Sequence, residues 1–214
     1  MRDIIIKNRK ETDVTGDALY ELYNESFKKW TQQGLDAPWL CPSFEEFCRQ
    51  LNTSTAFIAL DAATDELLGL HCLKKKKKHR RAYDFYLAVK PQAQGQGIAS
   101  RMLAYEVKVI KQAGYVYLID TTAMKAEWSV RWHMKNGYRI IGYHHSPNDN
   151  FANYMFRKQL APSILWGPTL GPLTARMSFA ASWLVNHLLK HSDGRDNLLG
   201  CFARKIIHLG HTKN

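Results

Sequence analysis

A glycine-rich turn between an apolar run and an amphipathic segment constrains this chain more than any other feature. The apolar run ends at Val89, the turn reads Gln94-Gly95-Gln96-Gly97-Ile98-Ala99, and apolar residues then recur at helical spacing as far as Ile110. This order predicts a strand, a tight turn and a helix that ends at Gly114. Glycine lets backbone N–H groups approach an anion closely, and a helix N-terminus adds partial positive charge. The turn is therefore predicted to hold phosphate groups.

The residues around the turn exclude two other phosphate-binding loops. The dinucleotide-binding fingerprint G-x-G-x-x-G would need a third glycine at position 100, where this chain has Ser100. The P-loop of nucleotide-binding proteins would need Gly-Lys followed by Ser or Thr, and no such tripeptide follows the turn. The remaining alternative is a capped turn between a strand and a helix that binds no ligand.

The longer stretch 87–103 resembles the central motif of the GNAT superfamily of N-acyltransferases. The family signature Q/R-x-x-G-x-G/A falls on Gln94, Gly97 and Ala99, directly after a Leu-Ala-Val-x-Pro strand end. Further along, Trp-His-Met-Lys-Asn-Gly-Tyr at 132–138 resembles the family's Phe-Tyr-Glu-Lys-x-Gly-Phe helix end. The two motifs lie in the order and spacing that the family uses.

The resemblance covers residues 1–160 and implies a GNAT acyltransferase domain with an α+β fold. Its central sheet would be mixed, mostly antiparallel, with about six to seven strands flanked by helices. The resemblance also implies acetyl-CoA as cosubstrate and transfer of an acetyl group to an unidentified amine acceptor by direct attack. Residues 161–214 are predicted to form a helical C-terminal extension, with helices at about 173–190 and 197–208. Their apolar faces must be covered, so we expect packing on the catalytic domain or across a homodimer.

The resemblance assigns the cofactor-binding residues to two neighbouring segments. Six residues of the turn would hold the pyrophosphate, mainly through backbone N–H groups: Gln94, Gly95, Gln96, Gly97, Ile98 and Ala99. Leu87, Ala88 and Val89 would pair with the pantetheine arm like an added strand. The N–H of Leu87 would polarise the acyl carbonyl, because an N–H directed at a developing oxyanion stabilises acyl transfer.

The catalytic side chains depart from the family pattern. Tyr83 occupies the position of the glutamate that serves as general base in the branch acting on histone-like lysines. Its neighbour Asp84 is a candidate base, although strand alternation directs adjacent side chains to opposite faces. His133 replaces the tyrosine that commonly protonates the departing thiolate, and Ala126 replaces an asparagine before that helix. We predict that His133 is the general acid, and the alternative is a packed helix histidine.

Two further questions about the site stay open at the level of sequence. The amine proton has four possible acceptors, which are Asp84, Glu127, His71 and a water chain to bulk solvent. The acceptor itself is not identified, although aromatic residues of the segment 30–44 border the place where the family binds it. These aromatics would suit an apolar or aromatic acceptor, and core packing is the alternative.

Periodicity and turn residues predict the remaining elements. Strands are expected at 4–6, 55–60, 67–73, 82–89, 115–119, 138–144 and 151–158, and helices at 19–30, 44–51, 98–110 and 127–135. The second helix begins with a capping box at 43–46, and its predicted inward face is Phe44, Phe47, Cys48 and Leu51.

Charge and cysteine content add mainly exclusions. The run from Lys74 to Arg81 holds seven of the net +11 charges, so the basic excess is local and nucleic acid is not an expected partner. Four cysteines without paired spacing predict no metal site and a reduced, cytoplasmic protein. No segment has the apolar length of a membrane span.

Two alternative functions remain. One is a binding module without activity, whose run from Lys74 to Arg81 contacts nucleic acid or an acidic partner. The other is an acyltransferase that works at a membrane surface through its C-terminal helices.

Overall fold

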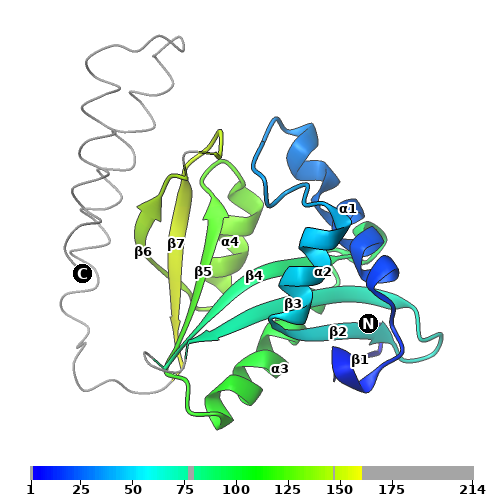
Figure 1. The fold of residues 1–214 in the computed structure, drawn as a ribbon. Helices are drawn as coiled ribbons and strands as arrows, with labels where there is room; N and C mark the ends of the chain where they lie inside the picture. The colour runs from blue at the N-terminus through cyan, green and yellow to red at the C-terminus, as the bar shows by residue number, and fades with distance from the viewer. Residues whose placement is uncertain (1, 77–79, 147, 161–214) are drawn as a thin grey trace, which may run out of the picture.

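The computed structural model describes residues 2–76, 80–146 and 148–160, which form one seven-stranded mixed sheet flanked by helices. The strands are β1 (Ile4–Asn8), β2 (Thr55–Asp61), β3 (Leu67–Lys76), β4 (Arg81–Val89), β5 (Tyr117–Ala123), β6 (Arg139–His144) and β7 (Asn153–Gln159). They lie in the order β1-β2-β3-β4-β5-β7-β6 (Figure 1). Only the pair β4 and β5 is parallel, and every other neighbouring pair is antiparallel. The predicted fold class is confirmed.

Helices cover both faces of the sheet. The described helices are α1 (Gly16–Gln32), α2 (Phe44–Asn52), α3 (Ile98–Gln112) and α4 (Glu127–Lys135), with short 3₁₀ turns η1 (Arg9–Glu11) and η3 (Pro91–Ala93). The helices α1 and α2 pack on one face, whereas α3 packs on the other (Figure 1). The helix α4 lies beside α3, where Trp132 Nε1 donates to Ser100 Oγ at 3.1 Å.

Local sequence signals explain where the helices begin and end. Thr15 caps α1 and Ser43 caps α2 by accepting a backbone N–H through the side chain. The predicted capping box is only half formed, because Glu46 bonds Arg49 and Gln50 instead of reaching back. Phe44 is 37% exposed, so the predicted inward face of α2 consists mainly of Phe47 and Leu51.

The end of α3 explains why β5 begins later than predicted. Gly114 adopts φ +82°, and the N–H of Tyr115 donates to the carbonyl of Ile110 at 3.1 Å. This pattern is a Schellman cap, which needs a left-handed residue that glycine supplies without steric cost. Tyr115 is thus part of the helix end and is buried in the core, so β5 runs from Tyr117 to Ala123.

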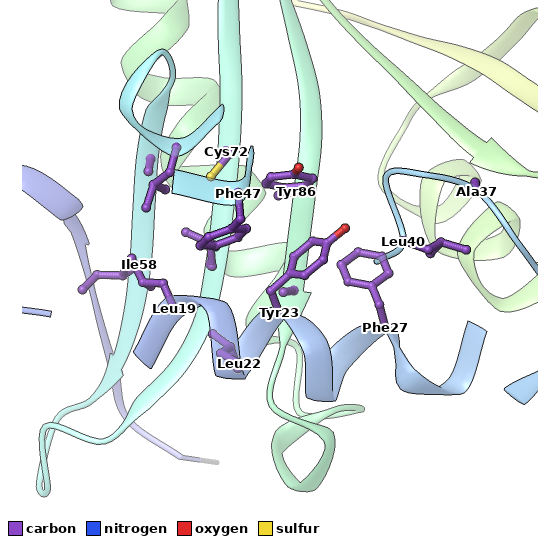
Figure 2. Packing of buried hydrophobic residues seen from close by; sticks show 14 of the residues in the cluster. Leu19, Leu22, Tyr23, Phe27, Ala37, Leu40, Phe47, Ile58, Cys72 and Tyr86 are labelled. Carbon is purple, nitrogen blue, oxygen red and sulfur yellow. The ribbon is translucent and has the colours of Figure 1, made fainter. Parts of the chain in front are cut away.

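Aromatic rings fill the core between the sheet and the helices α1 and α2. Figure 2 shows Tyr23 of α1 directed toward Phe47 of α2 and Tyr86 of β4, with Phe27 packed on its other side. The rings of Phe47 and Tyr86 stack with centroids 5.6 Å apart, and Tyr23 meets Tyr86 edge-on at 4.7 Å. Burial of large rings gives several kcal/mol of stabilisation, roughly 1.5–3 kcal/mol for each side chain. This cluster fixes α1 against β4, which matters for the site described next.

The predicted C-terminal extension, 161–214, lies outside the described residues, together with the homodimer expected through its helices. Residues 77–79 of the basic run also lie outside them. Among the described helices, none combines the length and apolarity that a bilayer crossing requires.

Candidate active site

Two strands at the centre of the sheet, β4 and β5, begin as neighbours and then separate. The region between them beyond the point of separation is the opening referred to below. Parallel pairing of β4 with β5 covers only three positions, and it ends where Tyr83 faces Ile119. Beyond that point the strands diverge, with β4 running toward α1 and β5 toward α4 (Figure 1). The second half of β4 therefore keeps its bonds to β3 and leaves its other edge without a strand partner among the described residues.

The hydrogen-bond pattern shows which backbone groups face this open edge. The N–H of Lys90 donates to the carbonyl of Leu68 on β3, at 2.9 Å. Bonded pairs alternate in an antiparallel ladder, so Ala88 also directs its N–H and carbonyl at β3. Leu87 and Val89 must then direct theirs away from β3, into the opening. Of the three residues expected to pair with the pantetheine arm, Leu87 and Val89 thus have the required orientation, whereas Ala88 directs its backbone groups at β3.

The two open positions on β4 differ in how their polar groups are satisfied. The carbonyl of Val89 accepts from Gln94 Nε2 of the turn at 3.0 Å, and it shares the single hydroxyl proton of Ser26 in α1, whose Oγ is 3.0 Å away, with the carbonyl of Leu22 at 2.7 Å. The N–H of Leu87 has no such protein partner among the described contacts. Gln94 therefore fastens the glycine turn to the strand end, while Leu87 keeps a donor for a ligand.

The glycine turn presents its backbone to solvent at the start of α3. Gly95 and Gly97 adopt φ +78° and +80°, a region in which other residues are strained. Gly97 is the N-cap of α3, and no side chain caps the helix. A Cβ added at either glycine would meet nothing within 4 Å. An uncapped helix start with open space in front of it fits a pyrophosphate, because its first N–H groups need acceptors and its dipole favours anions.

Comparison with known families decides between the possible readings of this geometry. The profile of the Acetyltransferase (GNAT) family matches residues 16–138, which is more than half of the chain. The chain belongs to this family. The matched range extends from the start of α1 through the open edge of β4 and the glycine turn to the end of α4, so it includes every part of the site described above.

Solved GNAT structures share the fold at low sequence identity. The ribosomal-protein-S18-alanine N-acetyltransferase from Escherichia coli aligns with a TM-score of 0.59 and 14% identity, over 77% of this chain and 100% of that one. An aminoglycoside 6'-acetyltransferase type Ii gives 0.59 and 21%, over 74% and 99%. A GNAT family acetyltransferase from Elizabethkingia anophelis, with acetyl-CoA bound, gives 0.56 and 16%, over 74% and 99%. No curated protein sequence matches the chain.

The predicted general acid of this GNAT protein, His133, is packed and fully hydrogen-bonded. Its side chain is 3% exposed and stacks on Phe156, with centroids 4.5 Å apart. Nδ1 lies 2.7 Å from the carbonyl of Ser129, and Nε2 lies 2.8 Å from Oδ2 of Asp120 on β5. Proton transfer from this ring to a thiolate would therefore require the bond between Nε2 and Asp120 to be exchanged. The catalytic role of His133 stays a prediction.

The surroundings of His133 set its charge state. Burial acts to lower its pKa, but the charge and hydrogen bond of Asp120 and the Ser129 carbonyl outweigh burial, so the pKa of His133 is raised. A raised pKa keeps more of the imidazole protonated near neutral pH. Asp120 was not among the residues singled out from the sequence, because its position opposite α4 depends on how β5 packs.

The second predicted side chain, Asp84, lies in a buried polar cluster beneath β4. Asp84 is 7% exposed, and its Oδ2 accepts from the hydroxyl of Tyr138 at 2.7 Å. His71 of β3 and Glu106 of α3 lie beside it. Burial raises the pKa of the Asp84 carboxyl, and it raises the pKa of Glu106 to about 8, while burial lowers the pKa of His71. No sequence signal singled out Glu106, which lies among the apolar positions of α3.

Aromatic residues of the segment 30–44 form a cluster between the end of α1 and the start of α4. Trp30 packs edge-on against Trp39 and against Trp128 of α4, with ring centroids 5.8 and 5.6 Å apart. Lys29 places its Nζ 4.8 Å from the centroid of Trp128. Trp30, Trp39 and Trp128 are all partly exposed while they support the core. The two sequence interpretations, core packing and acceptor border, are therefore compatible for these rings.

The basic run lies at the opposite end of β4 from the glycine turn. Its described residues lie at the end of β3, at the start of β4 and, for Arg80, in the turn just before β4. Lys74 bonds Gln50 of α2 and places its Nζ 5.1 Å from the ring centroid of Phe85, so this residue is part of the fold. Lys75 and Lys76 are exposed.

Proposed function

We propose that this protein is an acetyl-CoA-dependent N-acetyltransferase that transfers the acetyl group directly to an amine acceptor. The observation that carries the proposal is the continuity of the open edge of β4 with the uncapped start of α3. Acetyl-CoA is the cosubstrate. A thioester bound along Leu87–Val89 would have its pyrophosphate at Gly95–Ala99, since the strand and the turn are separated by one 3₁₀ turn.

In this proposal the backbone of β4 binds the pantetheine arm and polarises the acyl carbonyl. Leu87 and Val89 pair with the amides of the pantetheine arm as an additional strand would, which explains why their polar groups face away from β3. The N–H of Leu87 donates to the acyl oxygen and stabilises the negative charge that develops there during attack. Gln94 holds the turn at the strand end, so the two anchoring segments keep a fixed separation.

The reaction requires one proton to leave the amine and one to reach the sulfur. The amine nitrogen forms the bond to the acyl carbon, and the carbon–sulfur bond breaks. His133 gives its proton to the departing thiolate, whose free thiol has a pKa of about 8.5, and is reprotonated from solvent. We assign removal of the amine proton to the water chain, because Asp84 and His71 are buried and Glu127 is 77% exposed at the side chain.

The acceptor is proposed to approach past the partly exposed rings of Trp30, Trp39 and Trp128. The partly exposed rings favour an amine that carries an apolar or aromatic group, and the proximity of Lys29 disfavours an acceptor with further positive charge. We keep a cytoplasmic location as part of the proposal, since free cysteines occur at 41, 48 and 72.

A pair of proline substitutions tests the role of the open edge. Leu87→Pro removes an N–H that faces the opening and leaves the ladder to β3 intact, so the variant should fold but lose at least about 100-fold in turnover number, the size of one oxyanion donor. Ala88→Pro removes an N–H that bonds β3 and should destabilise the fold, because a ladder hydrogen bond is lost. The measurements are thiol release from acetyl-CoA over a panel of amines, and thermal unfolding. A fully active Leu87→Pro variant, or wild-type protein without turnover on any amine class, would contradict the proposal.

A further inference from the structure

Three side chains from distant parts of the sequence meet in the interior of the domain. His71 comes from β3, Asp84 from β4 and Glu106 from α3, and they are 1%, 7% and 0% exposed. One ligand atom from each lies within 4.8 Å of the others. The cluster sits between the sheet and α3, below the point where β4 and β5 part, and the proposed acetyl transfer does not use it.

The two contacts of His71 inside this cluster do not have the geometry of hydrogen bonds. His71 Nδ1 lies 2.7 Å from Glu106 Oε2, and His71 Nε2 lies 3.5 Å from Asp84 Oδ1. Despite these distances, five atoms have no hydrogen-bond partner of acceptable geometry in the described part of the chain: His71 Nδ1 and Nε2, Asp84 Oδ1, and Glu106 Oε1 and Oε2. Nitrogen and oxygen atoms that lie close together without hydrogen-bond alignment resemble neighbouring ligands of one metal ion.

The charges of the cluster require a counterion or protons. A buried, unpaired carboxylate costs several kcal/mol, and here two lie together with a neutral imidazole. Burial raises the pKa of both carboxyls and so favours their protonated forms; when both are ionised, their combined charge of −2 is cancelled by one divalent cation. Interior carboxylates are normally paired or bound to metal, because burial of a charge without such compensation costs free energy.

We propose that His71, Asp84 and Glu106 form a structural site for a divalent transition-metal ion, with zinc as the best match. One imidazole nitrogen, Asp84 Oδ1 and the two oxygens of Glu106 supply four N and O ligands, which is the number that zinc prefers. Four of the five unsatisfied atoms then have a partner. Ligand atoms from different residues in a tetrahedral zinc shell lie roughly 3.3 Å apart, so binding would widen the 2.7 Å contact between His71 Nδ1 and Glu106 Oε2 and draw the more distant ligand atoms, within 4.8 Å of one another, closer.

The neighbouring Tyr138 supplies the outer support that metal ligands usually have. Its hydroxyl donates to Asp84 Oδ2, which fixes the carboxylate and leaves Oδ1 directed at the cluster. Because His71 and Asp84 belong to the sheet and Glu106 to α3, the ion would cross-link the helix to the strands beneath it. That helix begins at the glycine turn, so the ion would stabilise the support of the cofactor site without touching the reacting atoms.

The direct test uses the wild-type full chain without an affinity tag, purified from zinc-supplemented cells. Metal analysis after dialysis should find close to one equivalent of zinc. A strong chelator should lower the melting temperature, and added ZnCl₂ should restore it. Protein without stoichiometric metal, whose melting temperature responds to neither chelator nor ZnCl₂, would overturn the proposal and leave a cluster neutralised by protons. The test does not depend on acetyltransferase activity.

Substitutions locate the ion. Glu106→Gln keeps the side-chain shape but removes one charge, and it should abolish stoichiometric zinc. Glu127→Gln changes an exposed glutamate on α4 and should leave zinc content unchanged. Tyr138→Phe removes the outer hydrogen bond and should weaken zinc binding by about 10- to 100-fold. If Glu106→Gln does not fold, Co²⁺ substitution of the wild type decides: tetrahedral absorption bands support the site, and the bands of hexahydrated Co²⁺ alone refute it.

Discussion

The two halves of β4 support the protein in different ways. From Leu87 to Val89 the strand offers backbone groups on an open edge, and no side chain there carries out chemistry. At Asp84 the same strand directs a carboxylate into the interior, where His71 and Glu106 surround it. A register shift between Cys72 and Leu73, opposite Phe85, separates the two regions. Backbone recognition tolerates changes of side chain, whereas the buried cluster depends on three particular residues.

The largest effect is expected at the glycine turn, where a substitution should abolish acetyl-CoA binding. Gly97→Glu places a carboxylate in the open space before α3 and imposes a left-handed conformation that costs about 1–2 kcal/mol. Wild-type protein at 100 times the dissociation constant of acetyl-CoA should gain about 2.7 kcal/mol, and the variant should gain nothing. The measurement is the thermal shift with acetyl-CoA. Gly114→Glu is the matched control, because it has the same strain at the other end of α3 and should keep the shift.

The next effect concerns the side chain beside the opening. His133→Phe should lower the turnover number by roughly 10- to 100-fold with little change in cofactor affinity, because the proton donor is lost, and it should also lower the melting temperature, because Asp120 loses its hydrogen bond to the ring. His133→Tyr restores a donor and should recover part of the rate. Steady-state kinetics and equilibrium binding of acetyl-CoA measure the two effects. Wild-type turnover in His133→Phe would assign the residue to packing and the thiolate proton to solvent.

A change of pH sharpens the role of His133 further. Asp120 on β5 faces the ring directly, Asp84 and Tyr138 lie nearby, and His71 interacts with it through charge. The pKa of His133 is raised in the folded state, so its contribution to stability is complete below the ordinary histidine pKa of about 6.5 and is lost as pH rises through the folded value. Asp120→Asn should therefore shift the alkaline limb of activity to lower pH. A pH profile identical to that of the wild type would show that the protonation of His133 does not control the rate.

A smaller effect is expected at the link between strand and turn. Gln94→Ala removes one of the two side-chain donors to the Val89 carbonyl, and Ser26 Oγ retains the other. The loss of one hydrogen bond of about 1 kcal/mol corresponds to a roughly fivefold weaker affinity for acetyl-CoA. Gln92→Ala, one turn earlier and exposed, should leave the affinity unchanged. Isothermal titration calorimetry distinguishes the two variants.

The smallest effect is expected at the far end of β4. Lys75→Ser together with Lys76→Ser should leave acetyl-CoA affinity nearly unchanged, because both residues precede the opening on the sheet. If the basic run instead made seven phosphate contacts, nucleic-acid affinity would fall with salt at a log–log slope of roughly −6. A salt titration with duplex and single-stranded DNA therefore tests the binding-module alternative. Strong, salt-dependent binding would show that this end of the molecule binds nucleic acid.

The sequence by itself determined the parts that depend on local backbone chemistry. Gly95 and Gly97 mark a turn that needs positive φ, and apolar spacing marks the strand before it and the helix after it. These signals lie in one continuous stretch, 81–112, so their meaning does not depend on distant contacts. The predicted phosphate site followed from them, and the fold class followed from the resemblance of these motifs to the GNAT family, while the start of β5 was missed, because a Schellman cap absorbed Tyr115.

Only the tertiary structure decided which side chains meet. The sequence positions of His71, Asp84 and Glu106 show no metal-ligand spacing, and Glu106 interrupts an otherwise apolar helix face without any partner nearby in the chain. Asp120 and His133 become a pair only when α4 packs on β5. The physical reason is that a backbone turn is specified by the residues that form it, whereas the charge state and partners of a buried side chain are set by whatever the fold packs around it.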